Sequence, residues 1–217
     1  MRRTLLGLTT ALATMLAPAA SADHQPGHGD QRTLTLAAAP TTVKFGGAVT
    51  LHGTLSGSNA SGRNVTVRQD PFPLDTFTDA GNATTDANGE WSLLHEPVAN
   101  TRYQARSGNT ESPVVDVMVR PSISLRLGDR TPRRGQRVRF SGRLCPEHDG
   151  TRVALQRRSA SGWRTLARPV LKDLPGTACS AFARRLRVRR DGAYRVRFSG
   201  DADHVAGNSR MRRADVG

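Results

Sequence analysis

Arginine is the residue type best placed to do chemistry in this sequence, and it is concentrated toward the C-terminus. The segment RRLRVRRDGAYRVRFSG, residues 184–200, carries seven arginines interleaved with apolar side chains. Guanidinium groups form forked, charge-assisted hydrogen bonds with phosphate and carboxylate groups. Several of them on one surface would bind a polyanion and release its counterions. Whether they share a surface depends on the elements that carry them.

The basic charge belongs to one half of the chain. Residues 23–120 carry 7 basic and 10 acidic side chains, a net −3, and residues 121–217 carry 23 and 8, a net +15; two further arginines within residues 1–22 complete the total of +14. A solvated strand face in a genome that prefers arginine codons is the alternative explanation, because only Lys44 and Lys172 are lysines. No row of aromatic residues for base stacking and no nucleic-acid-binding motif accompanies the arginines, which argues against sequence-specific nucleic-acid recognition.

The first 22 residues, MRRTLLGLTTALATMLAPAASA, have the features of a secretory signal peptide. Arg2 and Arg3 form a positive start, residues 5–16 form an apolar stretch, and Ala20-Ser21-Ala22 is a small-residue cleavage site. We therefore expect cleavage after Ala22, a flexible leader over residues 23–31, and a secreted, extracellular protein. The general secretory route and the twin-arginine route both fit this start. No later stretch approaches the roughly 20 apolar residues that a membrane-spanning helix needs, so no membrane span is expected.

The remaining sequence contains two collinear copies of one pattern. The first copy reads Gly46-x-x-Val49-x-Leu51-x-Gly53-x-Leu55, and the second reads Gly135-x-x-Val138-x-Phe140-x-Gly142-x-Leu144, 89 residues later. A further block begins at Gly62 in the first copy and at Gly150 in the second, an offset of 88 residues. "TRYQARSG" at 101–108 also matches "GAYRVRFSG" at 192–200. The repeats predict two domains, residues 32–120 and residues 121–217.

Each copy has the pattern of β-strands rather than helices. Short alternating runs are separated by glycine, proline, asparagine and aspartate, and no helical period follows residue 22. In GQRVRFSGRL, Val138, Phe140 and Leu144 fall on one side of a strand, and Arg137 and Arg139 fall on the other. This alternation is typical of antiparallel sheets that have one dry face and one wet face. The prediction is an all-β protein made of two antiparallel sandwiches.

The same runs carry a resemblance to a known family. "GAVTLHGTLSG", "GRNVTVRQ", "TTDANGEWSL" and "NTRYQARSG", with "GQRVRFSGRL", "GTRVALQRRSASGWRTLA" and "DGAYRVRFSGDADH" in the second copy, resemble the bacterial immunoglobulin-like (Ig-like) repeats found in tandem in exported proteins of high-GC Gram-positive bacteria. The resemblance covers nearly all of the mature chain and rests on turn and core residues, so it is specific for fold. It implies two tandem Ig-like β-sandwich domains, which in that family serve as spacers, adhesion modules or appendages to enzymes. The spacing in Asp191-Gly192-Ala193-Tyr194 resembles a tyrosine corner, which implies a buried ring whose hydroxyl bonds to the backbone.

The chain has two cysteines, Cys145 and Cys179, both in the second copy. An even pair in an exported protein predicts a disulfide. In the implied fold, Cys145 ends one strand and Cys179 begins another, and these two strands are antiparallel neighbours. If they face each other directly, paired residue numbers sum to 324. This register sets two arginine pairs opposite each other, Arg139 with Arg185 and Arg137 with Arg187.

One sheet face is therefore expected to collect arginines as a candidate polyanion-binding surface, made of Arg126, Arg137, Arg139, Arg143, Arg185, Arg187 and Arg189. The apolar residues of the 184–200 segment are expected to be buried, namely Leu186, Val188, Tyr194, Val196 and Phe198. Arg195 and Arg197 are expected to emerge from the opposite sheet. In the alternation of the strand, Arg184 falls on the same side as the buried Leu186 and Val188. This position of an arginine predicts a bulge nearby or a later start of the strand.

We expect no catalytic residues, no cofactor and no metal site. Two histidines and two aspartates lie in the flexible leader without a rigid frame, namely Asp23, His24, His28 and Asp30. The other histidines are scattered, with no grouping around a nucleophile, and are His52, His95, His148 and His204. Trp91 and Trp163 could alternatively form a pair that stacks on a sugar. We predict instead that both side chains pack in the core or at a sheet edge.

The leading functional prediction is a secreted, non-catalytic binding or structural module. The alternative is a cell-surface binder of a polyanion, such as teichoic acid, an acidic polysaccharide or DNA, through the arginine-rich face. The sequence does not name the partner, and the candidates are an anionic cell-wall polymer or another surface protein. A secreted hydrolase is the second alternative, and it would need a cleft with converging acid and base groups.

Overall fold

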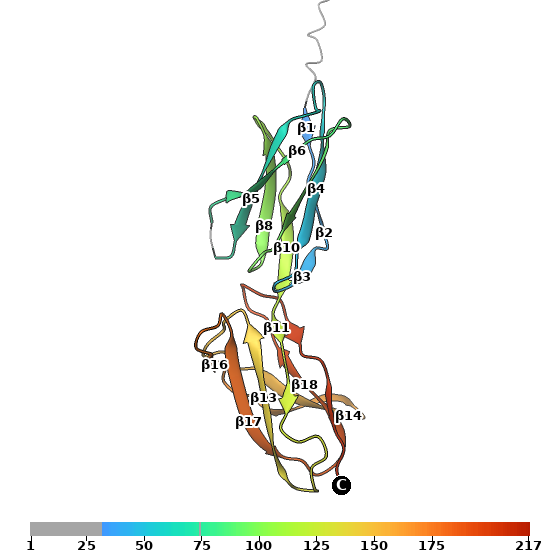
Figure 1. Ribbon diagram of the computed structural model, residues 1–217, viewed down its shortest axis with the longest axis vertical. Coiled ribbons are helices and arrows are strands. Elements are labelled where there is room, and N and C mark those ends of the chain that lie inside the picture. Colours follow the sequence, from blue (N-terminus) through green and yellow to red (C-terminus); the bar gives the residue numbers. More distant parts are fainter. Residues whose placement is uncertain (1–31, 74) are drawn as a thin grey trace, which may run out of the picture. The chain divides into compact units, whose positions relative to one another are not determined.

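The computed structural model describes residues 32–73 and 75–217, and every regular element in this part of the chain is a β-strand (Figure 1). The all-β prediction is confirmed. The predicted signal peptide, its cleavage site and the leader over residues 23–31 lie outside the described residues. Within the described part, no helix has the length and apolar character needed to cross a membrane.

Residues 33–120 form two sheets, which we call the N-terminal sheet pair (Figure 1). In the first sheet, β4 (Val49–Ser56) pairs with β1 (Thr33–Leu34), β2 (Ala37–Ala39) and β7 (Glu90–His95). The second sheet has the order β3 (Thr42–Lys44), β10 (Val115–Arg120), β8 (Thr101–Ser107), β5 (Asn64–Pro71) and β6 (Thr78–Thr84), with β9 (Thr110–Glu111) also on β8. The β3–β10 pairing is parallel and the others are antiparallel.

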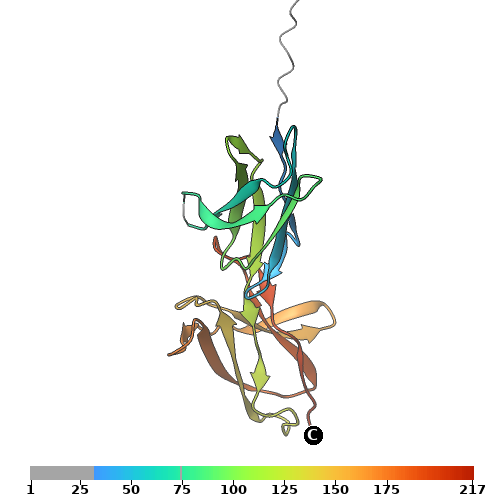
Figure 2. The same cartoon turned by 45° about the horizontal axis from the view of Figure 1, so that its top comes forward.

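Residues 122–214 form two further sheets, the C-terminal sheet pair. In one sheet, β13 (Arg137–Cys145) pairs with β11 (Ser122–Ile123), β12 (Arg126–Leu127) and β17 (Ser180–Arg187), and β17 pairs with β16 (Lys172–Asp173). The other sheet has the order β15 (Gly162–Ala167), β14 (Ala154–Ser159), β18 (Gly192–Phe198) and β19 (Gly207–Asn208), with β20 (Arg212–Ala214) also on β18. Figure 2 shows the β14–β15 hairpin on the side away from β17.

Each sheet pair has its own apolar core, because the alternating strands bury one side. In β13, Val138, Phe140 and Leu144 are buried, whereas Arg137 and Arg139 are exposed. All members of the N-terminal core come from residues 34–119, and all buried members of the C-terminal core come from residues 123–214.

Both tyrosine rings are buried, as the pattern predicts, with Tyr194 packed at 5.0 Å between ring centroids on Phe140. The expected bond from the Tyr194 hydroxyl to the backbone is not among the hydrogen bonds of the described residues. The hydroxyl of Tyr103 lies 2.9 Å from Nδ1 of His95, which is a side-chain partner.

The same hydrogen bonds occur twice, 89 residues apart. Thr35 donates its backbone N–H to the Thr54 carbonyl at 3.0 Å, and Ser124 donates to the Arg143 carbonyl at 2.9 Å. In return, the hydroxyls of Thr35 and Ser124 accept the N–H groups of Thr54 and Arg143 at 2.8 and 3.0 Å. The pairings of β1 with β4 and of β11 with β13 also repeat at this offset.

Two glycines of the repeated pattern each face a backbone carbonyl group at close range. A Cβ atom at Gly53 would lie 2.0 Å from the Thr35 carbonyl oxygen, and one at Gly142 would lie 2.1 Å from the Ser124 carbonyl oxygen. Real Cβ atoms do not approach backbone so closely, so both positions require glycine.

The register between β13 and β17 agrees with the sum of 324. Pairing runs without a shift from Arg137 opposite Arg187 to Leu144 opposite Ser180. The predicted disulfide between Cys145 and Cys179 is present, with the two Cα atoms 4.3 Å apart.

The expectation of a bulge or a late strand start near Arg184 is wrong. The strand β17 begins at Ser180, and Arg184 lies opposite the buried Phe140 in an unbroken ladder. Arg184 is nevertheless exposed. The reason is that β16 pairs only with Ser180 and Ala181, so among the described residues the rest of this β17 edge has no neighbouring strand. A long side chain can bend around such an edge and keep its charge in water.

Burial of the 184–200 segment follows the prediction at four of the five apolar positions. Val188, Tyr194, Val196 and Phe198 are buried. Leu186 is only partly buried against the core. It lies on the same open stretch of β17 as Arg184, which leaves part of its side chain in contact with water.

Candidate functional site

Six of the seven predicted arginines lie on the outer face of the sheet that contains β13 and β17. Cross-strand partners in an antiparallel ladder point to the same side of the sheet. The pairs Arg137–Arg187 and Arg139–Arg185 therefore share a face with Arg143, and Arg126 joins them because it lies opposite Ser141. All six side chains are exposed. We call this set, Arg126, Arg137, Arg139, Arg143, Arg185 and Arg187, the arginine face.

Arg189 does not belong to the ladder. It follows the end of β17 at Arg187 and is exposed beyond it. A basic residue that sequence reasoning left out takes a place on the face instead: Lys172 of β16 pairs with Ala181, which pairs in turn with Arg143. The register sum of 324 could not place Lys172, because β16 is a separate short strand.

No ion pair within the described part of the chain involves an arginine of the arginine face. In the part of the chain that the structure describes, the three ion pairs are Arg68–Glu111, Arg102–Asp70 and His148–Asp201. None of the face arginines is within ion-pair distance of a carboxylate there. Like charges directly opposite each other on a sheet destabilise it by about 0.2–1 kcal/mol per pair. A bound anion would remove this repulsion at the two opposed arginine pairs.

One arginine of the opposite sheet is held by other side chains of the protein. Arg195 and Arg197 lie on β18, as predicted. The Arg195 guanidinium stacks over the Trp163 ring, 4.0 Å from its centroid, and its Nε–H donates to Oε1 of Gln156 at 2.9 Å. Because the Arg195 guanidinium already makes a cation–π contact and a hydrogen bond within the protein, it is less available to an external anion. Trp163 therefore packs under an arginine, and Trp91 is buried at 4% exposure, so both tryptophans are packing residues.

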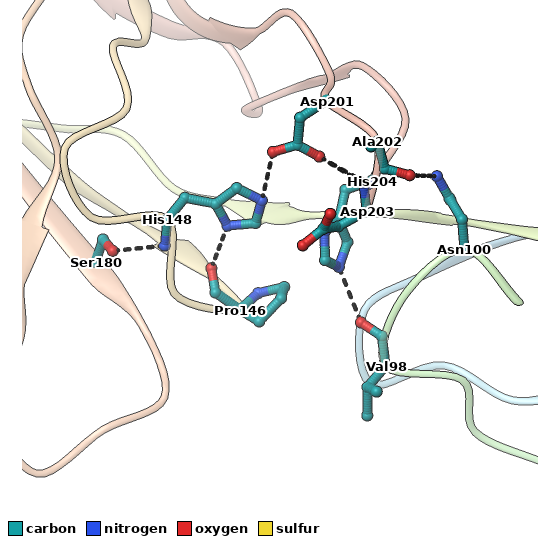
Figure 3. Close-up of polar contacts among 9 residues, drawn as sticks. All are labelled: Val98, Asn100, Pro146, His148, Ser180, Asp201, Ala202, Asp203 and His204. Carbon is teal, nitrogen blue, oxygen red and sulfur yellow. Dashed lines mark hydrogen bonds and ion pairs between the residues drawn. The ribbon is translucent and has the colours of Figure 1, made fainter. Parts of the chain in front are cut away.

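The histidine prediction needs a correction. His148 and His204 are not scattered, because their ring centroids lie 4.9 Å apart, at 64° to each other (Figure 3). Asp201 completes a cluster in which one ligand atom from each residue lies within 4.8 Å of the other two. We call these three residues the His–Asp cluster.

Several contacts fix His148. Its backbone N–H donates to the Ser180 hydroxyl at 2.8 Å, and its ring Nδ1 lies 2.9 Å from the Pro146 carbonyl oxygen (Figure 3). The ring packs edge-on against Phe198, with 4.9 Å between the centroids. Since Pro146 and Ser180 directly follow the two bridged cysteines in sequence, the disulfide holds together both segments that position this histidine.

A turn holds Asp201 and His204. Oδ1 of Asp201 accepts the backbone N–H groups of Asp203 and His204, at 3.1 and 2.8 Å. Nε2 of His204 lies 2.8 Å from the Val98 carbonyl oxygen of the N-terminal sheet pair (Figure 3). Burial lowers the pKa of His204, and the hydrogen bond to Val98 opposes that effect.

Only weak signals in the sequence could have revealed this cluster. His148 and His204 lie far apart in the chain and neither is on a strand with a recognisable ligand spacing. The one local signal is the polar run DADH at residues 201–204, in the segment that follows β18.

Comparison with known proteins assigns no family. No model of a protein family matches the chain, and no curated protein matches it.

Proposed function

We propose that this protein is a secreted, non-catalytic binding or structural module of two tandem Ig-like β-sandwich domains, residues 32–120 and 121–217. The observation that carries the proposal is the repeated framework. The strand pairing, the reciprocal hydrogen bonds of Thr35 and Ser124 and the glycine that faces each of them recur at one offset of 89 residues. Each copy also has its own core. A duplicated pair of small β domains is suited to presenting a surface.

Two features support export. The first 22 residues have the composition of a signal peptide, and the Cys145–Cys179 disulfide suits an oxidising compartment. The test is intact-mass measurement of the protein from a culture medium. The expected chain starts at Asp23 and is lighter than its reduced form by two hydrogen atoms. A retained N-terminus, or a mass that does not change on reduction, would refute the export proposal.

A second function is favoured by the arginine face. We propose that it binds an extracellular polyanion, such as teichoic acid, an acidic polysaccharide or DNA. Six exposed guanidinium groups share one face without carboxylate partners in the described residues, so they are available for forked contacts to phosphate or carboxylate groups. The direct test is salt-dependent retention on an anionic polymer, compared between variants that lose arginines from opposite sheets.

A further inference from the structure

The segment that carries two members of the His–Asp cluster is an elaboration of the repeated framework. In the N-terminal sheet pair, Ser112 donates its backbone N–H to the Ala105 carbonyl, and its hydroxyl accepts the N–H of Ala105. Ser209 and Val196 make the same two hydrogen bonds in the C-terminal sheet pair. These partners are seven residues apart in the first case and thirteen in the second. The additional six residues lie between β18 and β19, where Asp201 and His204 are found.

The hydrogen bonds define which ring nitrogens are free. A carbonyl oxygen only accepts, so Nδ1 of His148 carries the hydrogen that points to Pro146, and Nε2 of His204 carries the one that points to Val98. In the neutral rings, Nε2 of His148 and Nδ1 of His204 are therefore lone-pair acceptors. Both atoms are buried and have no hydrogen-bond partner among residues 32–73 and 75–217.

The cluster thus brings two hydrogen-bond acceptors, a ring nitrogen of His148 and a carboxylate oxygen of Asp201, close to each other. Nε2 of His148 lies 3.2 Å from Oδ2 of Asp201, an ion-pair distance without hydrogen-bond geometry. Oδ1 of this aspartate is already occupied by the turn, which leaves Oδ2 free to point at the ring. A lone pair and a carboxylate repel at this distance unless a positive charge lies between them. That charge is either a proton on His148 or a bound cation.

We propose that His148, Asp201 and His204 bind a divalent first-row transition metal ion, with Zn²⁺ as the best match. Two imidazole nitrogens and one carboxylate oxygen are a donor set for such an ion, whereas Ca²⁺ and Mg²⁺ prefer oxygen donors only. The second nitrogen of each ring donates to a backbone carbonyl, which is the usual way in which a protein orients metal-bound histidines. Three protein donors leave the fourth position of Zn²⁺ for water.

The dimensions of the cluster suit this ion. With bonds of 2.0–2.1 Å in a tetrahedral site, two donor atoms on Zn²⁺ lie about 3.3 Å apart. The separation between His148 and Asp201 is 3.2 Å, and all three donor atoms lie within 4.8 Å of one another. The two separations that involve His204 are at most 4.8 Å, so binding would need at most a small shift of this side chain. Its side chain is carried by the segment between β18 and β19, which is outside both sheets.

The site is tested by isothermal titration of the EDTA-treated, dialysed protein with ZnCl₂. All samples carry His24→Gln and His28→Gln, which removes the leader histidines as an unrelated source of binding. We expect one Zn²⁺ per chain with a Kd of about 1 µM or tighter. Zn²⁺ at a hundredfold excess over Kd should raise the Tm by about 5–10 °C, and EDTA should reverse the rise.

Variants identify the ligands. His148→Gln and Asp201→Asn should each weaken Zn²⁺ binding at least tenfold. Asp201→Asn retains an Oδ1 acceptor for the turn, so we expect this variant to fold even if His148→Gln does not. The matched control is His52→Gln, because His52 is exposed and on β4. Visible d–d bands of bound Co²⁺ should show tetrahedral rather than octahedral coordination. Absence of Zn²⁺ binding would mean that a proton alone bridges His148 and Asp201, and unchanged affinity in Asp201→Asn and His148→Gln would equally overturn the site.

Discussion

At Gly142 the carbonyl oxygen of Ser124 occupies the space that a side chain would need. An added Cβ would also lie 2.8 Å from the ring of Phe182, so neither neighbour can yield easily. We expect Gly142→Ala to lower the free energy of unfolding of the C-terminal sheet pair by about 2 kcal/mol or more, as overpacking of a tight site does. Urea denaturation measures this change.

The control for that substitution is Gly128→Ala. A Cβ at Gly128 meets its nearest atoms at 3.5 Å, an ordinary contact, so the change should stay within about 0.5 kcal/mol. If Gly142→Ala were as well tolerated as Gly128→Ala, the close approach of the Ser124 carbonyl group to β13 would be wrong.

His95 should make stability depend on pH. Burial lowers its pKa from 6.5, and the nearby Glu96 partly opposes the effect. The hydroxyl beside it belongs to Tyr103, whose pKa burial raises to about 12, so this neighbour stays neutral. The unfolded chain therefore takes up a proton on His95 at a higher pH than the folded protein does. Its stabilising contribution is complete above pH 6.5 and is lost as the pH falls below that value.

Urea denaturation at a series of pH values between 7.5 and about 5 tests this. His95→Gln should reduce the loss of stability of the N-terminal sheet pair on acidification, whereas His52→Gln, at an exposed position of β4, should leave it unchanged. An identical pH profile for the wild type and His95→Gln would contradict the assignment.

Among the elements, β13 and β17 are held by the ladder and by the disulfide at its end. The bridge closes a segment with a sequence separation of 34 residues in a sheet pair of modest size. Replacement of both cysteines by alanine should lower the stability of the C-terminal sheet pair by about 2–4 kcal/mol. Because each pair has its own core, the N-terminal transition should not move.

Differential scanning calorimetry of the double variant separates the two transitions. Equal shifts in both would show that the sheet pairs do not unfold independently. The same variant should also loosen the His148 segment, because Pro146 and Ser180 position this histidine from the residues next to the bridge.

The strand framework could be predicted well because period-2 alternation and the cysteine pair constrain it strongly. Alternation placed Val138 and Phe140 inside and Arg137 outside, and the cysteine pair predicted the register that sets Arg139 opposite Arg185. The exposure of Arg184 could not be predicted in this way, because it depends on where the short strand β16 ends.

The His–Asp cluster was beyond pattern analysis for a related reason. Its members lie in connections between strands, and connections have no period that relates them. His148 lies beside the disulfide and packs on Phe198, and its contact with His204 joins two connections that are far apart in the sequence. The arginine face, in contrast, lies on regular strands, so its residues could be named from the sequence.

On the scale of the whole molecule, the charge separates with the sheet pairs. The acidic residues slightly exceed the basic ones in residues 23–120, and nearly all excess positive charge lies in residues 121–217. A polyanion would therefore be attracted to the C-terminal sheet pair. Within it, none of the arginines of either sheet takes part in the three ion pairs of the described residues. The sheets differ in that two arginine pairs lie directly opposite each other on β13 and β17, whereas Arg195 of the other sheet is stacked on Trp163.

The measurement that tests polyanion binding most directly is the salt dependence of retention on columns of teichoic acid and of duplex DNA. One variant replaces Arg137, Arg139, Arg185 and Arg187 with glutamine. The matched control removes the same charge from exposed positions on the opposite sheet, by the same replacement at Arg158, Arg164, Arg197 and Arg213.

The logarithm of the binding constant should fall with the logarithm of salt concentration, and the first variant should reduce the DNA slope by about 0.7–0.9 for every phosphate group that it no longer neutralises. The control should keep nearly the wild-type slope, because its arginines lie outside the proposed site. Equal effects of the two variants, or no retention of the wild type at physiological salt, would contradict a binding site on the arginine face.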